Sequence, residues 1–277
     1  MDLASAIRQD VARALAEDIG TGDVTAQLIP AAQKAHARII TREAAVLSGA
    51  AWFEACYRQI EADVRIDWHA RDGDRITRDQ VLCEIDGPAR SLLTAERCSL
   101  NFLQTLSAVA TTTRAYVDAV AGTGVLILDT RKTLPGLRRA LKYAVRCGGG
   151  TNHRLGLFDG VLIKENHIAA AGGISPALDQ ARKLAPDIPT EIEVENIHQL
   201  REAIAAGAKL ILLDNFDLAG LREAVKLNAG RAALEASGGV NLDTVRAIAQ
   251  TGVDRISIGS LTKDIRAVDL SMRFVAT

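Results

Sequence analysis

The second half of the sequence repeats one pattern, in which a short apolar run is followed by a stretch long enough for a helix. The runs after Gly122 lie at 125–129, 160–163, 190–194, 209–213, 231–236 and 254–258. Continuous apolar strands that alternate with helices indicate strand–helix–strand units and a parallel sheet covered on both faces. The pattern therefore predicts an α/β fold, and it fits both a barrel and an open doubly wound sheet.

The first half of the sequence is organised differently, with short alternating runs separated by glycine and aspartate turns. Strands of a small mixed sheet are expected at 35–40, 62–68 and 81–85, and helices at 3–17, 49–60 and 91–121. The change of pattern falls inside the last of these helices, near residues 108–115. We therefore expect an N-terminal domain at 1–110 and a catalytic domain at 111–264.

Composition narrows the possible function classes. The chain has 277 residues, 48% of them hydrophobic, which is enough for one or two buried cores. A formal net charge of −1 gives no global basic field for nucleic acid or an anionic membrane. The four cysteines lack CxxC and zinc-finger spacing, so reduced, mostly buried thiols are expected. Because neither a signal peptide nor a membrane-length apolar run is recognisable, a cytoplasmic protein is expected.

Charged or small polar residues follow each apolar run of the second half. In parallel α/β folds the carboxyl ends of the strands form one rim, and ligands bind there. Consecutive strand ends of this kind predict one shared site. Its predicted members are 129–133, 164–167, Glu193, Glu195, Asp214, Asn215, 237–239, Gly259 and Ser260.

The predicted rim combines cations, carboxylates and glycines. Its cations are Arg131, Lys132 and Lys164, with His153 and Arg154 from a glycine-rich segment. Its carboxylates are Glu193 and Asp214. Glycines after the last two strands let a phosphate approach backbone N–H groups, and barrels frequently hold a phosphate there. We therefore expect a substrate with several negative charges, including at least one phosphate.

Simpler explanations stay open for single members of this set. The Arg131–Lys132 pair could belong to a solvated loop, His153 alone could be structural, and Asp214 could cap the next helix. Three carboxylates share one strand face and could also indicate a metal site: Glu191, Glu193 and Glu195. There is no GxxxxGK[ST] or GxGxxG motif, and none of the Asp-Asp dipeptides with which Rossmann-like phosphoribosyltransferases hold ribose.

Several longer motifs together resemble one known family. They are EDIGTGDVT at 17–25, DTRKT at 129–133, CGGGTNHRLGL at 147–157, LIKENH at 162–167, EIEVE at 191–195, LLDNF at 212–216 and EASGG at 235–239. They resemble quinolinate phosphoribosyltransferase over nearly the whole chain. The resemblance implies an N-terminal α/β sandwich domain completed by residues 265–277, and an incomplete α/β barrel of the type II phosphoribosyltransferase kind. It also implies a homodimer, with a hexamer of dimers as the larger assembly, in which Arg97 acts in the partner's site.

The resemblance further implies a reaction of NAD biosynthesis and a role for each motif residue. Quinolinate and phosphoribosyl pyrophosphate would give nicotinate mononucleotide, pyrophosphate and CO2, with Mg²⁺ as cofactor. The implied catalytic residues are Lys132, Lys164, Glu193 and Asp214, of which Glu193 and Asp214 would also hold the metal. Quinolinate would be bound by Arg97, Thr130, Arg131, His153 and Arg154. The phosphoribosyl group would be bound by Lys132, Lys164, Ser237, Gly238, Gly239, Ile258, Gly259 and Ser260.

Three other functions fit parts of the same pattern. One is a barrel relative associated with molybdenum-transport genes, which has similar residues and a different acceptor. Another is a Schiff-base aldolase that uses Lys164 as its nucleophile. The third is a non-catalytic sensor of phosphate ligands, which would have no use for carboxylates beside the cations.

Overall fold

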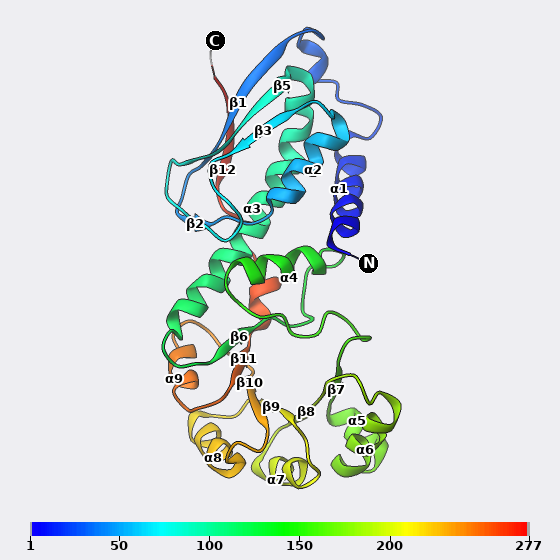
Figure 1. The fold of residues 1–277 in the computed structure, drawn as a ribbon, viewed down its shortest axis with the longest axis vertical. Coiled ribbons are helices and arrows are strands. Elements are labelled where there is room, and N and C mark those ends of the chain that lie inside the picture. The colour runs from blue at the N-terminus through cyan, green and yellow to red at the C-terminus, as the bar shows by residue number, and fades with distance from the viewer. Residues whose placement is uncertain (1, 276–277) are drawn as a thin grey trace. The chain divides into compact units, whose positions relative to one another are not determined.

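The computed structural model describes residues 2–275 and divides into two compact units (Figure 1). The first unit contains the chain up to Arg114, the segment Thr133–Gly149 and the residues from Thr262 onward. The second contains Ala115–Lys132 and Gly150–Leu261. Within residues 2–275, none of the helices combines the length and apolar character that crossing a membrane requires.

The first unit is built on an antiparallel sheet with the strand order β12-β1-β5-β3. Its strands are β1 (Lys34–Thr41), β3 (Arg65–Trp68), β5 (Val81–Pro88) and β12 (Leu270–Phe274). A separate two-stranded ribbon joins β2 (Ala45–Val46) to β4 (Arg75–Ile76). Because β12 pairs with β1, two segments that lie far apart in the sequence are neighbours in this sheet.

Helices and an aromatic cluster cover this sheet and form its core. The helices of this part are α1 (Leu3–Ile19), the 3-10 turn η1 (Ala26–Leu28), α2 (Ala50–Ile60), α3 (Ala89–Ala119) and α4 (Arg138–Cys147). Helix α1 begins where Asp2 accepts the Ser5 N–H at 2.6 Å, an N-cap that satisfies one of its free donors. In the core the ring of Phe53 lies 5.1 Å from Tyr57 and 5.4 Å from Trp68, which fastens α2 to β3.

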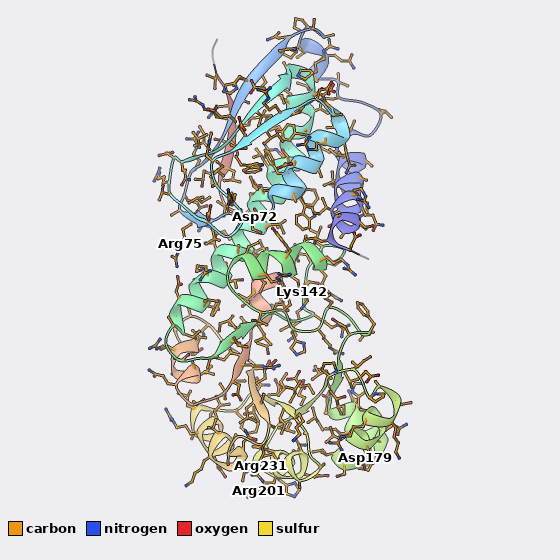
Figure 2. All side chains as sticks on the ribbon, viewed as in Figure 1. Asp72, Arg75, Lys142, Asp179, Arg201 and Arg231 are labelled. Atoms are coloured by element: carbon orange, nitrogen blue, oxygen red, sulfur yellow. The ribbon has the colours of Figure 1, made fainter. Side chains whose placement is uncertain are left out.

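Helix α4 belongs to the first unit, whereas the sequence placed 133–149 in the catalytic domain. Asp72, which Figure 2 labels, accepts the Ala50 N–H at 3.2 Å and the Tyr143 hydroxyl at 2.7 Å. The ring of Tyr143 also lies 5.3 Å from that of Trp52. Helix α4 is therefore grouped with the first compact unit, because it is bonded and packed to α2 and to the loop before β4.

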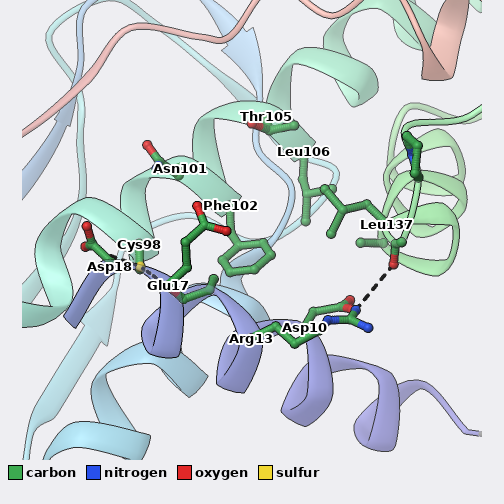
Figure 3. A pocket seen from close by; sticks show the side chains of 14 residues that line it. Asp10, Arg13, Glu17, Asp18, Cys98, Asn101, Phe102, Thr105, Leu106 and Leu137 are labelled. Carbon is green, nitrogen blue, oxygen red and sulfur yellow. Dashed lines mark hydrogen bonds and ion pairs between the residues drawn. The ribbon is translucent and has the colours of Figure 1, made fainter. Parts of the chain in front are cut away.

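A cavity of about 390 Å³ lies within the first unit between α1, α3 and the loop before α4 (Figure 3). Asp10 in its wall is buried, and it accepts hydrogen bonds from Arg13 and from Nε1 of Trp52. Arg13 also donates to the Gly136 carbonyl at 3.5 Å. These contacts join α1 to α2 and to the loop, so we assign this wall a structural role.

The second unit contains a parallel sheet with the strand order β6-β11-β10-β9-β8-β7. Its strands are β6 (Leu126–Leu128), β7 (Val161–Ile163), β8 (Thr190–Val194), β9 (Leu210–Asp214), β10 (Ala233–Ser237) and β11 (Arg255–Ser257). Each strand from β8 to β11 lies beside the one before it, and β6 follows β11. A doubly wound sheet reverses direction part-way, so this order is that of a barrel.

The barrel is incomplete. Within residues 2–275 no strand ladder joins the edge strands β6 and β7. A single parallel bridge between Leu128 and Thr151 lays the chain along the open edge of β6. His153 follows two residues after this bridge and contacts Glu191 on β8 and Glu235 on β10. The helices that alternate with the strands are α5 (Glu165–Ala171), α6 (Ile174–Leu184), α7 (Ile197–Ala205), α8 (Leu218–Asn228) and α9 (Val245–Ala249), with the 3-10 turn η2 (Gly259–Thr262) after β11.

Candidate active site

An ion pair joins the carboxyl ends of two neighbouring strands. Lys164 follows β7, and its Nζ lies 2.7 Å from Oε2 of Glu193 on β8. The Glu193 side chain is 10% exposed and that of Lys164 44%, so the ammonium faces outward from a nearly buried carboxylate. An ammonium placed in this way suits an anionic ligand. A Schiff-base lysine needs its neutral amine, so the pair argues against the aldolase alternative.

A buried carboxylate ties the loop after β6 to the segment along the open edge. Asp129 is inaccessible to solvent and accepts from Nδ2 of Asn152 at 2.6 Å and from the His153 N–H at 2.9 Å. Its own N–H donates to the Thr151 carbonyl at 3.2 Å. These bonds fix Asp129 against Thr151, Asn152 and His153, and so join the two cation-bearing segments that the sequence predicted, 129–133 and 147–154.

The guanidinium groups of Arg131 and Arg154, one from each of these segments, are close enough for the charge of Arg131 to lower the pKa of Arg154. Nη1 of Arg154 donates to the Gly160 carbonyl at 3.0 Å. Burial lowers the pKa of Arg154, Arg131 lowers it further, and Glu191 and Asp159 oppose both effects. Because two neighbouring cations repel, a ligand with at least two negative charges is favoured here.

Glycines bring three further strand ends together. Gly238 has φ of 102°, and a Cβ there would lie 2.1 Å from Oδ1 of Asn215, so only glycine fits. The Asn215 N–H donates to the Ser237 carbonyl at 2.9 Å, which joins the loops after β9 and β10. A Cβ on Gly259 would lie 3.1 Å from Cδ of Lys132. The backbone after β11 therefore lies against a lysine of the rim, and a lysine beside glycine N–H groups suits a phosphate.

Asp214 ends β9 and does not cap the helix after it. Helix α8 has Asp217 as its N-cap, and the Asp217 carboxylate accepts the Gly220 N–H at 2.7 Å. The Asp214 carboxylate instead accepts from Nδ2 of Asn215 at 2.8 Å and is half-buried at the rim. The explanation of Asp214 as only a helix cap is therefore wrong.

The ring of His153 turns into the barrel. Its Nε2 lies 2.8 Å from Oε2 of Glu191 and 3.8 Å from Oε1 of Glu235, and its Nδ1 accepts the Arg154 N–H at 2.7 Å. Both ring nitrogens therefore have protein partners. A hydrogen bond between His153 and quinolinate, which the sequence predicted, requires that one of these partners be exchanged. Within residues 2–275, His153, Glu191 and Glu235 are close enough to share a metal ion.

Comparison with known proteins identifies the family of this chain. Residues 23–107 match the family described as quinolinate phosphoribosyl transferase, N-terminal domain, and residues 109–273 match its C-terminal domain. The chain belongs to the quinolinate phosphoribosyltransferase family. The resemblance read from the motifs is therefore confirmed.

Individual quinolinate phosphoribosyltransferase relatives are similar over most of their length. A Bacillus subtilis protein named probable carboxylating nicotinate-nucleotide pyrophosphorylase is 45% identical over 257 residues, which cover 92% of this chain and 89% of that protein. The Mycobacterium leprae protein of the same activity is 42% identical over 274 residues, 96% of each chain. The solved nicotinate-nucleotide pyrophosphorylase from Francisella tularensis matches with a TM-score of 0.97 and 45% identity, covering 99% of this chain and 98% of that one. These relatives confirm the predicted fold class and enzyme class.

The predicted site residues differ from the observed rim at Arg97 and at two carboxylates. Arg97 is exposed on α3 in the first unit, and the other predicted site residues all belong to the second. Its action in the partner's site stays a prediction. Sequence reasoning missed Glu235 and the anchoring role of Asp129. For Glu235 a signal existed, since it is an acidic residue inside the apolar run 231–236.

Proposed function

We propose that this protein joins quinolinate to phosphoribosyl pyrophosphate in the synthesis of NAD, and releases nicotinate mononucleotide, pyrophosphate and CO2. The observation that carries the proposal is the juxtaposition at the barrel rim of mutually repelling guanidinium groups, Arg131 and Arg154, with the Lys164–Glu193 pair. The two guanidinium groups suit a dicarboxylate. The Lys164–Glu193 pair suits a substrate in which positive charge develops beside phosphates.

Quinolinate carries two adjacent ring carboxylates, which need several donors. In the proposed complex Arg131 and Arg154 bind these carboxylates, because guanidinium groups match the two oxygens of a carboxylate. The hydroxyl of Thr130 is held near them, since it accepts the Lys132 N–H at 3.0 Å. Arg97 of the partner subunit would complete the pocket, so the homodimer is part of this proposal, with a hexamer of dimers as the larger assembly.

Phosphoribosyl pyrophosphate would lie across the glycine loops. Lys132 is held against Gly259, where the backbone after β11 can approach the 5-phosphate. Lys164 offers its exposed ammonium to the pyrophosphate. Departure of pyrophosphate leaves positive charge on the ribose, and the carboxylates of Glu193 and Asp214 can stabilise it.

The pyridine nitrogen then attacks the anomeric carbon and becomes a pyridinium. Loss of the carboxylate at C2 as CO2 leaves its bonding electrons on C2, where the adjacent cationic nitrogen stabilises them until a proton is taken up. The protein therefore needs no organic cofactor for the decarboxylation. Its residues orient the two substrates so that the ring nitrogen faces the ribose.

Magnesium is the proposed cofactor, and the donors of the rim fit it. Carboxylate oxygen is the ligand that Mg²⁺ prefers, and it usually arrives with substrate phosphates. Asp214 is the better of the two predicted ligands, because Glu193 is already paired with Lys164 at 2.7 Å. Bound magnesium would neutralise charge on the pyrophosphate as it leaves. We also propose that the enzyme is cytoplasmic.

The test is direct. Quinolinate labelled with carbon-14 in its C2 carboxylate is incubated with the enzyme, phosphoribosyl pyrophosphate and Mg²⁺, and labelled CO2 and nicotinate mononucleotide are measured. Nicotinate serves as the control acceptor, because it lacks the C2 carboxylate and leaves cations of the pocket unpaired. Such a loss can reduce use of an analogue by about 10⁴-fold. Comparable use of both acids, or no CO2 from quinolinate, would contradict the proposal.

A further inference from the structure

The carboxyl group of Glu235 lies inside the barrel and has no role in the reaction proposed above. Its side chain is 1% exposed. Neither of its oxygens has a well-formed hydrogen bond within residues 2–275, although the Ser257 hydroxyl lies close enough to stabilise the carboxylate weakly. A buried carboxylate with so little hydrogen bonding is strongly destabilised, and a protonated carboxyl much less so. The burial of Glu235 therefore favours its neutral form.

The groups around Glu235 shift its pKa in both directions, and the effects that raise the pKa are the larger ones. These groups are Glu191 on β8, His153 on the segment along the open edge, Arg255 and Ser257 on β11, and the apolar register neighbour Leu212 on β9. Burial, followed by the charge of Glu191, raises the pKa of Glu235 to about 7, although His153, Ser257 and Arg255 lower it. Glu235 therefore exchanges its proton near neutral pH.

The hydrogen-bond partners of His153 favour one tautomer of its ring. Its Nδ1 accepts the Arg154 N–H at 2.7 Å and so has no hydrogen of its own. The ring hydrogen is then on Nε2, which donates to Oε2 of Glu191 at 2.8 Å. A metal ion at Nε2 would shift that hydrogen to Nδ1, where it would meet the Arg154 N–H. The cluster is therefore built to hold protons and not a metal ion.

We propose that Glu235 is a positioning residue that favours the binding of quinolinate. Its protonated carboxyl leaves Glu191 as the single charge that holds the ring of His153. The ring of His153 in turn holds the backbone of Arg154. The inference rests on the proposed function, in which Arg154 binds a quinolinate carboxylate. It adds a residue that contacts neither substrate and acts through the hydrogen bonds of His153.

Ionisation of Glu235 would disturb this arrangement. Two carboxylates would then face each other in the barrel interior, and both would compete for the single hydrogen on Nε2 of His153. The ring would turn towards Glu235, and its Nδ1 would move away from the Arg154 N–H. The segment that carries the Arg154 guanidinium would shift as a result, and quinolinate would bind more weakly.

The expected signature is a KM for quinolinate that rises as the pH passes through 7. If only the enzyme with protonated Glu235 binds quinolinate, about one molecule in eleven is competent at pH 8, because the pKa is about 7. The KM should therefore be about tenfold higher at pH 8 than at pH 6. The kcat should change far less, since saturating quinolinate selects the competent form.

The test compares wild type with Glu235→Gln, which keeps the length of the side chain and cannot ionise. Its KM for quinolinate should stay low and nearly constant from pH 6 to 8. The matched control is Glu223→Gln on the exposed face of α8, which should keep the tenfold rise. KM is measured from initial rates at saturating phosphoribosyl pyrophosphate and Mg²⁺. Calorimetric titration of quinolinate into the enzyme alone gives the affinity without turnover.

Several outcomes would overturn the inference. One is the same pH dependence of KM in wild type and Glu235→Gln. Another is stoichiometric zinc binding that Glu235→Gln abolishes, since it would make the cluster a metal centre. If circular dichroism shows that Glu235→Gln is misfolded, Glu235→Met supplies a second neutral side chain of similar length, and a tenfold rise in that variant would also refute the inference. An enzyme that releases no CO2 from quinolinate at any pH would instead refute the proposed function.

Discussion

Replacing Glu235 by glutamine should change how the free energy of unfolding depends on pH. The pKa of this carboxyl is about 7 in the folded chain against an ordinary value of 4.5. Because the folded-state pKa is raised, the stability that Glu235 contributes is fully present below pH 4.5 and is lost as the pH rises through 7. The whole loss corresponds to about 3 kcal/mol, of which about 2 kcal/mol falls between pH 5.5 and 8. Glutamine does not ionise, so the variant should gain about 2 kcal/mol over wild type across that interval.

The assay must report on the second unit. Both tryptophans, Trp52 and Trp68, lie in the first unit, so fluorescence follows that unit only. Urea unfolding is therefore followed by far-UV circular dichroism at several pH values from 5.5 to 8, with fluorescence as the reference. Glu223→Gln should run parallel to wild type. A difference between wild type and Glu235→Gln that stays constant with pH would refute the reasoning, because Glu235 would then not titrate in this range.

Three further predictions concern the substrates, the metal and the dimer. Gly259→Val should raise the KM for phosphoribosyl pyrophosphate and leave quinolinate binding to the free enzyme intact, since a Cβ there would lie 3.1 Å from Cδ of Lys132; equal damage to both would indicate misfolding. A chelator should abolish turnover and added Mg²⁺ restore it, and full activity in metal-free buffer would exclude the metal. Arg97→Ala and Glu193→Ala should each be nearly inactive, but unfolding, mixing and refolding them together should restore about one quarter of wild-type activity, because about half of the dimers then have one intact site. Heterodimers detected by mass spectrometry without recovered activity would place Arg97 outside the partner's site.

The rim could be predicted from the sequence because its signals are local. Lys164, Glu193 and Asp214 each stand at or beside the end of an apolar run, and parallel strands bring their carboxyl ends together whatever the strand order. The pairing of Lys164 with Glu193 follows from the adjacency of β7 and β8. The strand order itself depends on contacts between distant segments, which is why periodicity left barrel and doubly wound sheet equally open.

Other features depend on interactions that no single segment encodes. The sequence pattern grouped the segment of helix α4 with the barrel. Its place in the first unit depends on the contacts of Tyr143 with Asp72 and Trp52, which no local pattern reveals. The protonation state of Glu235 also could not be predicted from the sequence. Its charge state depends on burial and on Glu191, two strands away in the sheet, and on a histidine from a third segment.

The pairing of β12 with β1 has a consequence for how the protein is made. Residues of β1 emerge from the ribosome long before Phe274, the register partner of Ala37. One side of β1 therefore stays without its neighbour until β12 has been synthesised, and an uncovered strand edge can recruit other chains. The second unit, whose last segment ends at Leu261, can fold while the sheet of the first is still open. The sheet of the first unit is thus completed after the strands of the second unit have been made, and a nascent chain arrested before Leu270 should depend on chaperones to protect β1.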